Sequence, residues 1–349
     1  MRHRYRLHAC ATISLSQGAT VPPPSNGLAK LAQQAPPLVF DRASGQLTGA
    51  SPLVRAAVSA LQAGSAATKA MGHRGYGVGC RVVGSVMAPR ELLVRLNEDA
   101  LFAMPFCDAY WSRLLNCSYD YEREIEAFLS AACQDHYTLL DCGANFGYWS
   151  VLATSRPFGA QQAIAIEASS SNAERLKRNA ELNGNRFRYL HAALGGRSGE
   201  IVRVAGAKHE KFATVPLTQS EPGCVETVSL DGLAEAGLID ASGPLVIKLD
   251  VEGVEIEALR GGQGLLKTDC VVICEEHGSD RTHAVSRYLA EETSLKRYIF
   301  DEENGVFMQL EELDGLARIK KHPWVGYNVF ATASKRWRER LLSARWTSK

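Results

Sequence analysis

The 349-residue sequence lacks a long apolar run, a dominant charge and any paired cysteine spacing. No stretch approaches the roughly 20 apolar residues of a spanning helix, so we expect no integral membrane segment. The formal net charge is only +1, which argues against nucleic acid as the partner. The nine cysteines include no C-x-x-C pair and no metal-finger spacing. These absences favour a soluble protein with free thiols in a reducing, cytoplasmic compartment.

The first 50 residues carry little signal for a packed fold. Residues 1–6 are basic like the start of a signal peptide, but residues 7–17 are too polar for its apolar core, so we expect no secretion signal. Residues 16–50 are rich in Pro, Gly, Ser, Ala and Gln. This composition predicts that residues 1–50 form a low-complexity, disordered extension.

Three further segments follow this extension. Residues 51–118 combine an Ala-rich helical pattern over 51–70 with two apolar runs within 82–106, which predicts a helix and hairpin forming a lid or cap. Residues 119–333 are expected to form the catalytic domain. The basic tail at 334–349 is amphipathic; we expect a solvated final helix, with a weak chance of surface contact with a membrane.

The most informative segment of the chain is Leu-Leu-Asp-Cys-Gly-Ala-Asn-Phe-Gly at residues 139–147. An apolar run ends there in an acid, Asp141, and a Gly-x-x-x-Gly turn from Gly143 to Gly147. Such a turn lets backbone approach a ligand and aims the amides of the next helix at it. A second apolar run ends in Glu167, placed to bind both hydroxyls of a ribose. The two signals together predict a nucleotide-like cofactor.

The loop also lacks what a dinucleotide site needs. Ala144 and Asn145 stand where the G-x-G-x-x-G pattern would have its middle glycine. Asp141 would repel a phosphate but accept a hydrogen bond from an ammonium group. We therefore expect a cationic cofactor, S-adenosylmethionine, held by Asp141, Gly143, Asn145, Gly147 and Glu167, with Asn145 either touching its methionine tail or capping the next helix.

These motifs, in order, resemble those of the FkbM family of methyltransferases. The resemblance covers residues 119–312 and includes Leu-Lys-Arg-Asn at 176–179, Val-Ser-Leu-Asp at 228–231 and Ile-Lys-Leu-Asp-Val-Glu-Gly-Val-Glu at 247–255. It implies a class I methyltransferase fold and methyl transfer from S-adenosylmethionine, usually to a hydroxyl of a sugar or natural product. The acceptor is not fixed by it.

The order of apolar runs predicts an α/β, Rossmann-like fold with a mostly parallel doubly wound sheet and a closing antiparallel strand. Strands are expected at 137–142, 163–168, 188–194, 245–250 and 269–276, and helices at 121–133, 147–155, 170–183, 254–260 and 282–291. Residues 306–310 and 327–330 are expected to supply the closing pair.

The reacting residues are expected at strand ends facing the methyl group. Asp250 closes the strand predicted beside the first one, and Glu252 follows it in the turn. His277 ends the neighbouring strand and exchanges protons near neutral pH. We expect Asp250 and Glu252 to line the reaction centre and Glu252 or His277 to take the proton of the acceptor hydroxyl.

Several alternatives stay open from sequence. Lys248 is expected to pair with a neighbouring acid such as Glu275. No metal ligand is assigned, because no metal-specific spacing links Asp250, Glu252, Glu276 and His277. An NAD(P)-dependent oxidoreductase is a second enzyme hypothesis, although the chain lacks a Tyr-x-x-x-Lys relay. A catalytically silent adenosyl-binding module is a third. No Asn/Asp-Pro-Pro-Tyr motif follows the strand ending at Asp250, which disfavours methylation of nucleobases.

Overall fold

A twisted eight-stranded sheet forms the centre of the protein, described here from a computed structural model that covers residues 37–208, 211–216 and 223–346. Its strand order is β15-β14-β16-β13-β12-β5-β6-β7. The strands are β5 (Thr138–Cys142), β6 (Gln162–Glu167), β7 (Arg188–His191), β12 (Leu245–Leu249), β13 (Cys270–His277), β14 (Lys296–Asp301), β15 (Val306–Gln309) and β16 (Gly326–Thr332). Strands β7, β6, β5, β12 and β13 run parallel, and β16 is antiparallel to β13. The doubly wound, class I methyltransferase fold class is therefore confirmed.

The closing strands differ in one detail from the sequence prediction. Strands β15 and β16 do not pair with each other, because β14 lies between them and pairs antiparallel with both. The β14 segment carries Tyr298, Ile299 and Phe300, all buried. This apolar run precedes the predicted pair and takes the central position in it.

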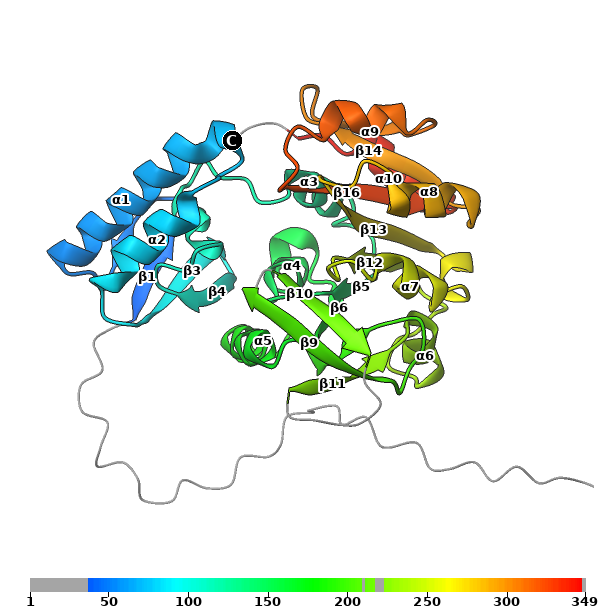
Figure 1. The fold of residues 1–349 in the computed structure, drawn as a ribbon, viewed down its shortest axis with the longest axis horizontal. Coiled ribbons are helices and arrows are strands. Elements are labelled where there is room, and N and C mark those ends of the chain that lie inside the picture. The colour runs from blue at the N-terminus through cyan, green and yellow to red at the C-terminus, as the bar shows by residue number, and fades with distance from the viewer. Residues whose placement is uncertain (1–36, 209–210, 217–222, 347–349) are drawn as a thin grey trace, which may run out of the picture.

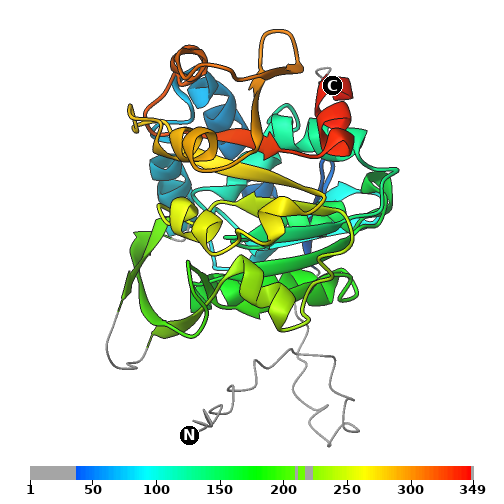
Figure 2. The same cartoon turned by 90° about the vertical axis from the view of Figure 1, so that its right-hand side faces the viewer.

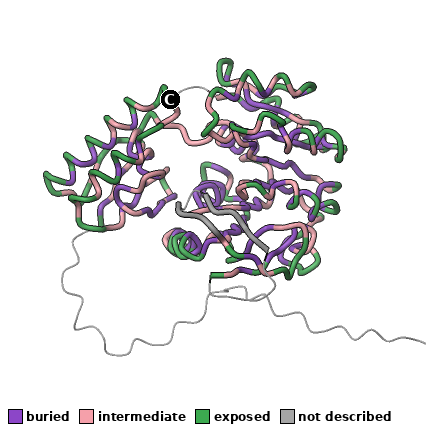
Figure 3. The backbone as a smooth tube through the Cα atoms, viewed as in Figure 1, coloured by how far each residue is buried: buried purple, intermediate pink, exposed green. Residues whose placement is uncertain are grey.

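Helices cover both faces of the sheet (Figures 1 and 2). The helices are α3 (Arg123–Ala131), α4 (Tyr148–Ala153), α5 (Ser170–Leu182), α6 (Leu230–Glu235), α7 (Glu255–Arg260), α8 (Ala284–Glu291), α9 (Asp314–Ile319) and α10 (Lys335–Ser343), with 3-10 turns η3 (Arg156–Phe158) and η4 (Leu265–Lys267). Alternate strand residues face opposite cores. Leu139 and Val246 pack with α3, α4, α5 and α10, whereas Leu140 and Ile247 pack with α6, α7 and α8. Figure 3 shows the central strands as the most buried part of the tube.

Residues 38–115 build a second unit beside the sheet rather than a loose lid. Its four strands, in the order β2-β1-β3-β4, are β1 (Leu38–Asp41), β2 (Leu47–Thr48), β3 (Glu91–Asn97) and β4 (Ala100–Pro105). Helices α1 (Pro52–Thr68) and α2 (Tyr76–Ser85) and the turns η1 (Lys69–Met71) and η2 (Trp111–Leu115) complete it. We call this unit, residues 38–115, the N-terminal module.

Two sequence predictions need correction here. The predicted disordered extension ends too late, because residues 38–48 form β1 and β2, and β1 pairs in parallel with β3; residues 1–36 lie outside the described part. The apolar triplet Leu38-Val39-Phe40, with Leu38 and Phe40 buried, outweighs the surrounding turn-forming composition. Helix α2 was not predicted, because Gly77, Gly79 and Gly84 within it are poor helix formers.

Two asparagines of α5 hold the N-terminal module against the sheet. Asn179 accepts a hydrogen bond from the Ala103 amide at 2.6 Å and donates to the Ala103 carbonyl at 3.1 Å. One turn later, Asn183 binds the Leu101 amide and carbonyl at 3.0 and 2.7 Å. Both target residues lie on β4, so two side chains of a helix satisfy backbone groups that a neighbouring strand would otherwise bind.

The remaining segments follow two different patterns. The stretch between Gly195 and Gly223 contributes β9 (Ile201–Lys208) and β10 (Lys211–Pro216), which pair with each other, and β9 also pairs with β11 (Cys224–Val228). A short strand, β8 (Ala193–Leu194), pairs with β11.

Helix α10 is not a separate tail, because Trp337 and Leu341 are fully buried against the domain. Across the described ranges, no helix is long and apolar enough to cross a membrane.

Candidate active site

A large cavity opens at the carboxyl ends of the central parallel strands. Its volume is about 1020 Å³, and the ends of β5, β6, β12 and β13 contribute to its lining. Seven of the eight residues proposed from sequence line it, namely Asp141, Gly143, Asn145, Glu167, Asp250, Glu252 and His277. Gly147 is not among the lining residues. The N-terminal module and the segment between α9 and β16 form the opposite wall.

Glu167 holds the loop after β5 in place. Its Oε2 accepts from the Asn145 amide and its Oε1 from the Ser169 amide, both at 2.8 Å. The Asn172 side chain also hydrogen-bonds this carboxylate, so protein donors hold both of its ends in place. Glu167 is 6% exposed, and this burial raises its pKa to about 7. The group therefore changes charge close to neutral pH.

The two glycines of the turn are required by contacts within the protein. A Cβ on Gly143, at φ +77°, would lie 1.7 Å from the carbonyl oxygen of Asp250. A Cβ on Gly147, at φ +86°, would lie 2.5 Å from a methyl carbon of Leu176. These contacts alone require both glycines, and the approach of a ligand to the same loop stays a prediction. Gly143 admits the chain that follows β12, and Gly147 admits helix α5.

Asp141 is tied to the helix that follows the turn. Its Oδ2 accepts from the Ser150 amide at 3.1 Å and from the Ser150 hydroxyl at 2.7 Å. Burial raises its pKa, against the opposing effect of the Lys248 ammonium. The side chain is 1% exposed, so Asp141 fixes the position of α4 while it closes the base of the cavity.

Lys248, Asp250 and Glu275 form a buried network beside it. Lys248 Nζ donates to Asp250 Oδ2 at 2.9 Å, so it pairs with a neighbouring acid as the sequence predicted, and that acid is Asp250 and not the example Glu275. Burial acts to raise the pKa of Asp250, but Lys248 and a hydrogen bond from Glu275 hold it below its usual value. Burial and the Asp250 carboxylate raise the pKa of Glu275 well above its usual range. The geometry therefore places an ionised Asp250 next to a protonated Glu275.

Glu252 and His277 come together although 25 residues separate them. Glu252 Oε2 lies 3.5 Å from His277 Nε2. The two side chains are 24% and 42% exposed, so both are open to solvent and to the cavity. A carboxylate beside an imidazole gives an arrangement that can accept a proton and orient the acceptor.

Glu276, the adjacent residue, points away from the cavity. It accepts from the Ser286 amide at 3.0 Å, lies 2.9 Å from His283 Nδ1, and forms a buried ion pair with Lys320. The group of four considered as a cation site is therefore divided between two environments. Within residues 37–208, 211–216 and 223–346, no cluster of three or more His, Cys, Asp or Glu is arranged to hold a metal ion.

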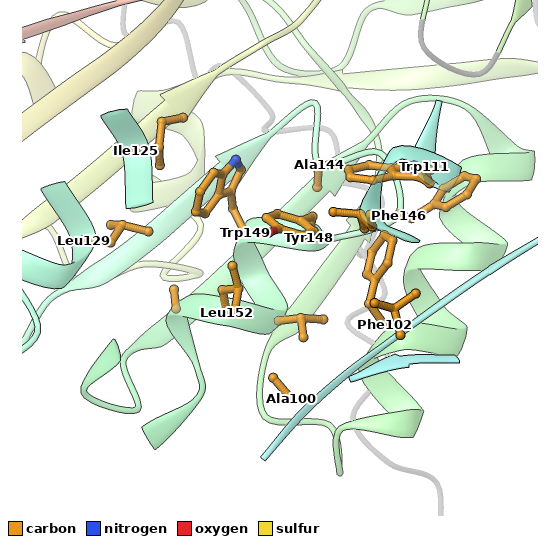
Figure 4. Close-up of a cluster of buried hydrophobic side chains, with 14 of the residues drawn as sticks. Ala100, Phe102, Trp111, Ile125, Leu129, Ala144, Phe146, Tyr148, Trp149 and Leu152 are labelled. Carbon is orange, nitrogen blue, oxygen red and sulfur yellow. The ribbon is translucent and has the colours of Figure 1, made fainter. Parts of the chain in front are cut away.

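Aromatic side chains from two regions of the chain gather in one cluster (Figure 4), of which Trp111, Tyr148 and Trp149 line the cavity. Trp111 of the N-terminal module stacks on Tyr148 with ring centroids 5.5 Å apart, and its indole donates to Asn145 Oδ1 at 3.1 Å. Trp149 donates to Glu122 at 2.6 Å, and Asn328 donates to Glu122 at 3.0 Å. Sequence reasoning missed Trp111, Glu122 and Asn328, because no periodicity or motif links these three positions.

Strained backbone marks the same cavity. Glu122, Asn145 and Glu252 all line it and have φ values of +43°, +53° and +56°. Non-glycine residues adopt this region at an energetic cost that surrounding contacts must offset, and such residues gather at functional sites. The strain therefore supports this cavity as the active site on grounds independent of its charges.

Comparison with known proteins gives a consistent assignment. Residues 141–299 match the family described as the methyltransferase FkbM domain. Over 175 residues the chain is 26% identical to the hexuronic acid methyltransferase AglP of Haloferax volcanii, covering 49% of this chain and 68% of that protein.

Solved structures show weaker similarity. A methyltransferase FkbM from Methylobacillus flagellatus KT matches with a TM-score of 0.37 and 14% identity, covering 56% of this chain and 43% of that one. The precorrin-6y C5,15-methyltransferase of Geobacter metallireducens GS-15 matches with a TM-score of 0.34 and 13% identity, covering 61% of this chain and 88% of that one. At these scores, the fold assignment rests on the sheet order described above. The chain spans less than half the length of the Methylobacillus protein.

Proposed function

We propose that this enzyme transfers the methyl group of S-adenosylmethionine to a hydroxyl of a sugar or a related small molecule, because residues 141–299 match the methyltransferase FkbM domain. The observation that carries the proposal is the position of Glu167, which ends β6 and lines the cavity beside the loop after β5. The family assignment also favours methyl transfer over the oxidoreductase and binding-module alternatives.

The lining residues fit this cofactor. The Glu167 carboxylate lines the cavity and can accept hydrogen bonds from ribose hydroxyls with the acceptor capacity that Asn145, Ser169 and Asn172 leave. Asp141 and Asp250 supply negative charge near the base of the cavity, which suits a sulfonium and an ammonium group and disfavours a pyrophosphate. We propose that Glu167, Asn145 and Asp141 hold the adenosyl and methionine parts.

Bound S-adenosylmethionine would supply a methyl group already activated by its sulfonium sulfur. The remaining requirements are alignment of the acceptor oxygen and removal of its proton. We propose that Asp250, fixed by Lys248, orients the acceptor hydroxyl, and that the Glu252–His277 pair takes the proton as the oxygen–carbon bond forms and the sulfur–carbon bond breaks. His277 Nε2 and Glu252 Oε2 lie 3.5 Å apart, so the imidazolium would be stabilised by the neighbouring carboxylate.

The acceptor class follows from two supports. The Haloferax volcanii relative is named for methylation of a hexuronic acid, which supports a sugar as acceptor here. The net charge of +1 is low for a protein whose main partner is a nucleic acid. The eight cysteines in the described ranges are free thiols, which supports a reducing cytoplasm as the compartment of the reaction.

Calorimetric titration with S-adenosylmethionine, S-adenosylhomocysteine and NADH tests the cofactor. We expect both adenosyl ligands to bind and Glu167→Ala to weaken them by about tenfold or more, because hydrogen bonds to a charged acceptor are lost. Glu174→Ala, at an exposed position of α5, is the matched control. Binding of NADH instead, or no adenosyl binding, would reject the proposal.

Transfer of a labelled methyl group to sugar acceptors tests the chemistry. We expect Glu252→Gln and His277→Ala to lower kcat by about 10²-fold or more while adenosyl binding persists. Full turnover in both variants would reject the assignment of the proton acceptor. Adenosyl binding without transfer to any hydroxylated acceptor would favour the silent binding module.

A further inference from the structure

The cavity has an acidic floor and a basic roof. We define the floor as the strand-end residues Asp141, Glu167, Asp250, Glu252 and Glu275, and the roof as Lys69, Arg74, Arg113, Lys321 and Trp324. The roof residues come from the N-terminal module and from the segment between α9 and β16. A cationic cofactor accounts for the floor but leaves the roof without a counterpart.

Arg113 is the most informative roof residue. Its guanidinium packs over the ring of Tyr110, 4.7 Å from the centroid, and its Nε is buried without a hydrogen-bond partner. No acid in the described ranges forms an ion pair with it, whereas Arg123 in the same cavity is paired with Glu302 at 2.9 Å. Its side chain also hydrogen-bonds the Tyr119 hydroxyl, a neutral group, so the charge of this partly buried guanidinium has no carboxylate counter-ion among the described residues and favours an anion in the cavity.

Arg74 and Lys321 extend this charge towards the cavity mouth. The Arg74 guanidinium lies 5.0 Å from the centroid of Trp324, and Trp324 stacks on His322 with ring centroids 5.1 Å apart. Both cations are exposed and, among residues placed by the structure, neither is paired with a carboxylate. Trp324 is 42% exposed and lines the cavity, so part of its indole can contact an acceptor beside Arg74.

The roof is joined directly to the proposed proton acceptor. The Gly278 amide, one residue after His277, donates to the Val325 carbonyl at 3.0 Å, one residue after Trp324. Gly72, at the turn that leads to Arg74, lies against Trp324, because a Cβ there would be 3.0 Å from the indole nitrogen. One acceptor molecule can therefore contact the roof and present a hydroxyl to the floor.

We propose that the roof is the acceptor subsite and that it selects an acceptor with a negatively charged group, a carboxylate or a phosphate, on its sugar ring. Arg113 binds the anionic group, Arg74 and Lys321 attract it, and Trp324 covers the ring. This inference rests on the proposed function for the identity of the site and adds the substrate class and the residues that determine it.

Equilibrium binding in the presence of S-adenosylhomocysteine tests the proposal without requiring turnover. The probes are methyl glucuronide, glucose 6-phosphate and methyl glucoside. We expect one of the two anionic probes to bind about tenfold more tightly than the neutral glucoside, with the preference weakening at high salt. A preference for the glucuronide identifies a carboxylate, and a preference for the phosphate identifies a phosphate.

Two roof variants and a control complete the experiment. Arg74→Gln, at an exposed position, and Arg113→Gln are each expected to reduce the preference for the anionic probe about fivefold or more and to leave adenosyl binding unchanged. Lys335→Gln, on α10 and outside the cavity lining, serves as control. Equal binding of all three probes, or a preference unchanged in Arg74→Gln, would overturn the inference. Failure of adenosyl binding would instead reject the proposed function.

Discussion

On the floor of the cavity Lys248 is paired with Asp250 and Glu252 lies beside His277, whereas on the roof Arg113, Arg74 and Lys321 form no ion pair with a described residue. Two floor carboxylates, those of Asp250 and Glu252, have a basic partner within the protein, and the floor is built on strand ends. The roof charges are placed by loops and by the N-terminal module. On our proposal, the floor holds the reacting groups in place without a ligand, whereas the roof is balanced by the anion of the acceptor.

A substitution in the loop after β5, at the cavity floor, should produce the largest effect. Gly143→Ala puts a Cβ 1.7 Å from the Asp250 carbonyl at a φ of +77°, so we expect it to lower the free energy of unfolding by about 3 kcal/mol or more. Urea denaturation measures this loss. Gly237→Ala, at a φ of +67° with nothing within 4 Å of the new Cβ, is the control for backbone strain alone. Equal losses in the two variants would show that the contact with Asp250 is unimportant.

Loosening the attachment of the N-terminal module to α5 is expected to give the second-largest effect. Asn179→Ala removes both hydrogen bonds to Ala103 and leaves a buried amide and carbonyl of β4 without that partner. We expect a loss of about 2 to 3 kcal/mol in unfolding free energy. Limited proteolysis of the N-terminal module should accelerate in parallel. Lys177→Ala, exposed on the same helix, should change neither measurement, and an intact module in Asn179→Ala would contradict the docking role.

The contribution of Glu167 to stability depends on pH. Burial raises its pKa from 4.5 to about 7. The folded protein therefore binds more protons than the unfolded chain between these values, and the stabilising contribution of the protonated group is lost as the pH rises through about 7.

Cofactor affinity should instead increase as the pH rises. The ionised carboxylate is the stronger acceptor for ribose hydroxyls, so S-adenosylhomocysteine should bind about tenfold more weakly at pH 6 than at pH 8. Calorimetry at both pH values measures this change. Glu167→Gln should remove the dependence, whereas Glu124→Gln, at the other cavity carboxyl with a pKa of about 7, should keep it. A dependence that survives in Glu167→Gln would assign the titration to another group.

The smallest effect concerns the contact between the module and the cofactor loop. Trp111→Phe removes the hydrogen bond to Asn145 Oδ1 while it keeps an aromatic ring beside Tyr148. We expect adenosyl affinity to fall about fivefold, corresponding to about 1 kcal/mol. Trp149→Phe, which loses the bond to Glu122 instead, is the matched comparison. Identical affinities for Trp111→Phe and the unchanged protein would show that the module does not order the loop.

The sequence predicted the floor well because its residues end apolar runs. Parallel strands bring their carboxyl ends to one edge, so Asp141, Glu167, Asp250 and His277 are predictable from four short patterns. The sequence did not predict the contacts within the protein that require the two glycines, since a contact with protein and a contact with ligand require the same absence of a side chain. It predicted that Lys248 pairs with a neighbouring acid but did not select Asp250, because two acids lie near that position and only the folded geometry selects between them.

The roof could not be predicted because tertiary contacts create it. Nothing in the surroundings of Arg113 or Arg74 along the chain indicates that either side chain faces an active site. Their role depends on helix α2, which the sequence did not predict because of its glycines. It also depends on the loop carrying Trp324, some 250 residues away from Arg74. Burial of an unpaired charge is a property of the fold and has no local pattern.

The attachment of β4 to α5 also bears on how such a protein can diverge. The hydrogen bonds from Asn179 and Asn183 are directed at the backbone of Ala103 and Leu101, so they do not depend on which side chains β4 carries. Substitutions across the outer surface of the module can therefore accumulate without loosening its attachment. A lineage that retains the asparagine pair is free to alter the residues facing the acceptor, and new specificities can arise on an unchanged catalytic frame.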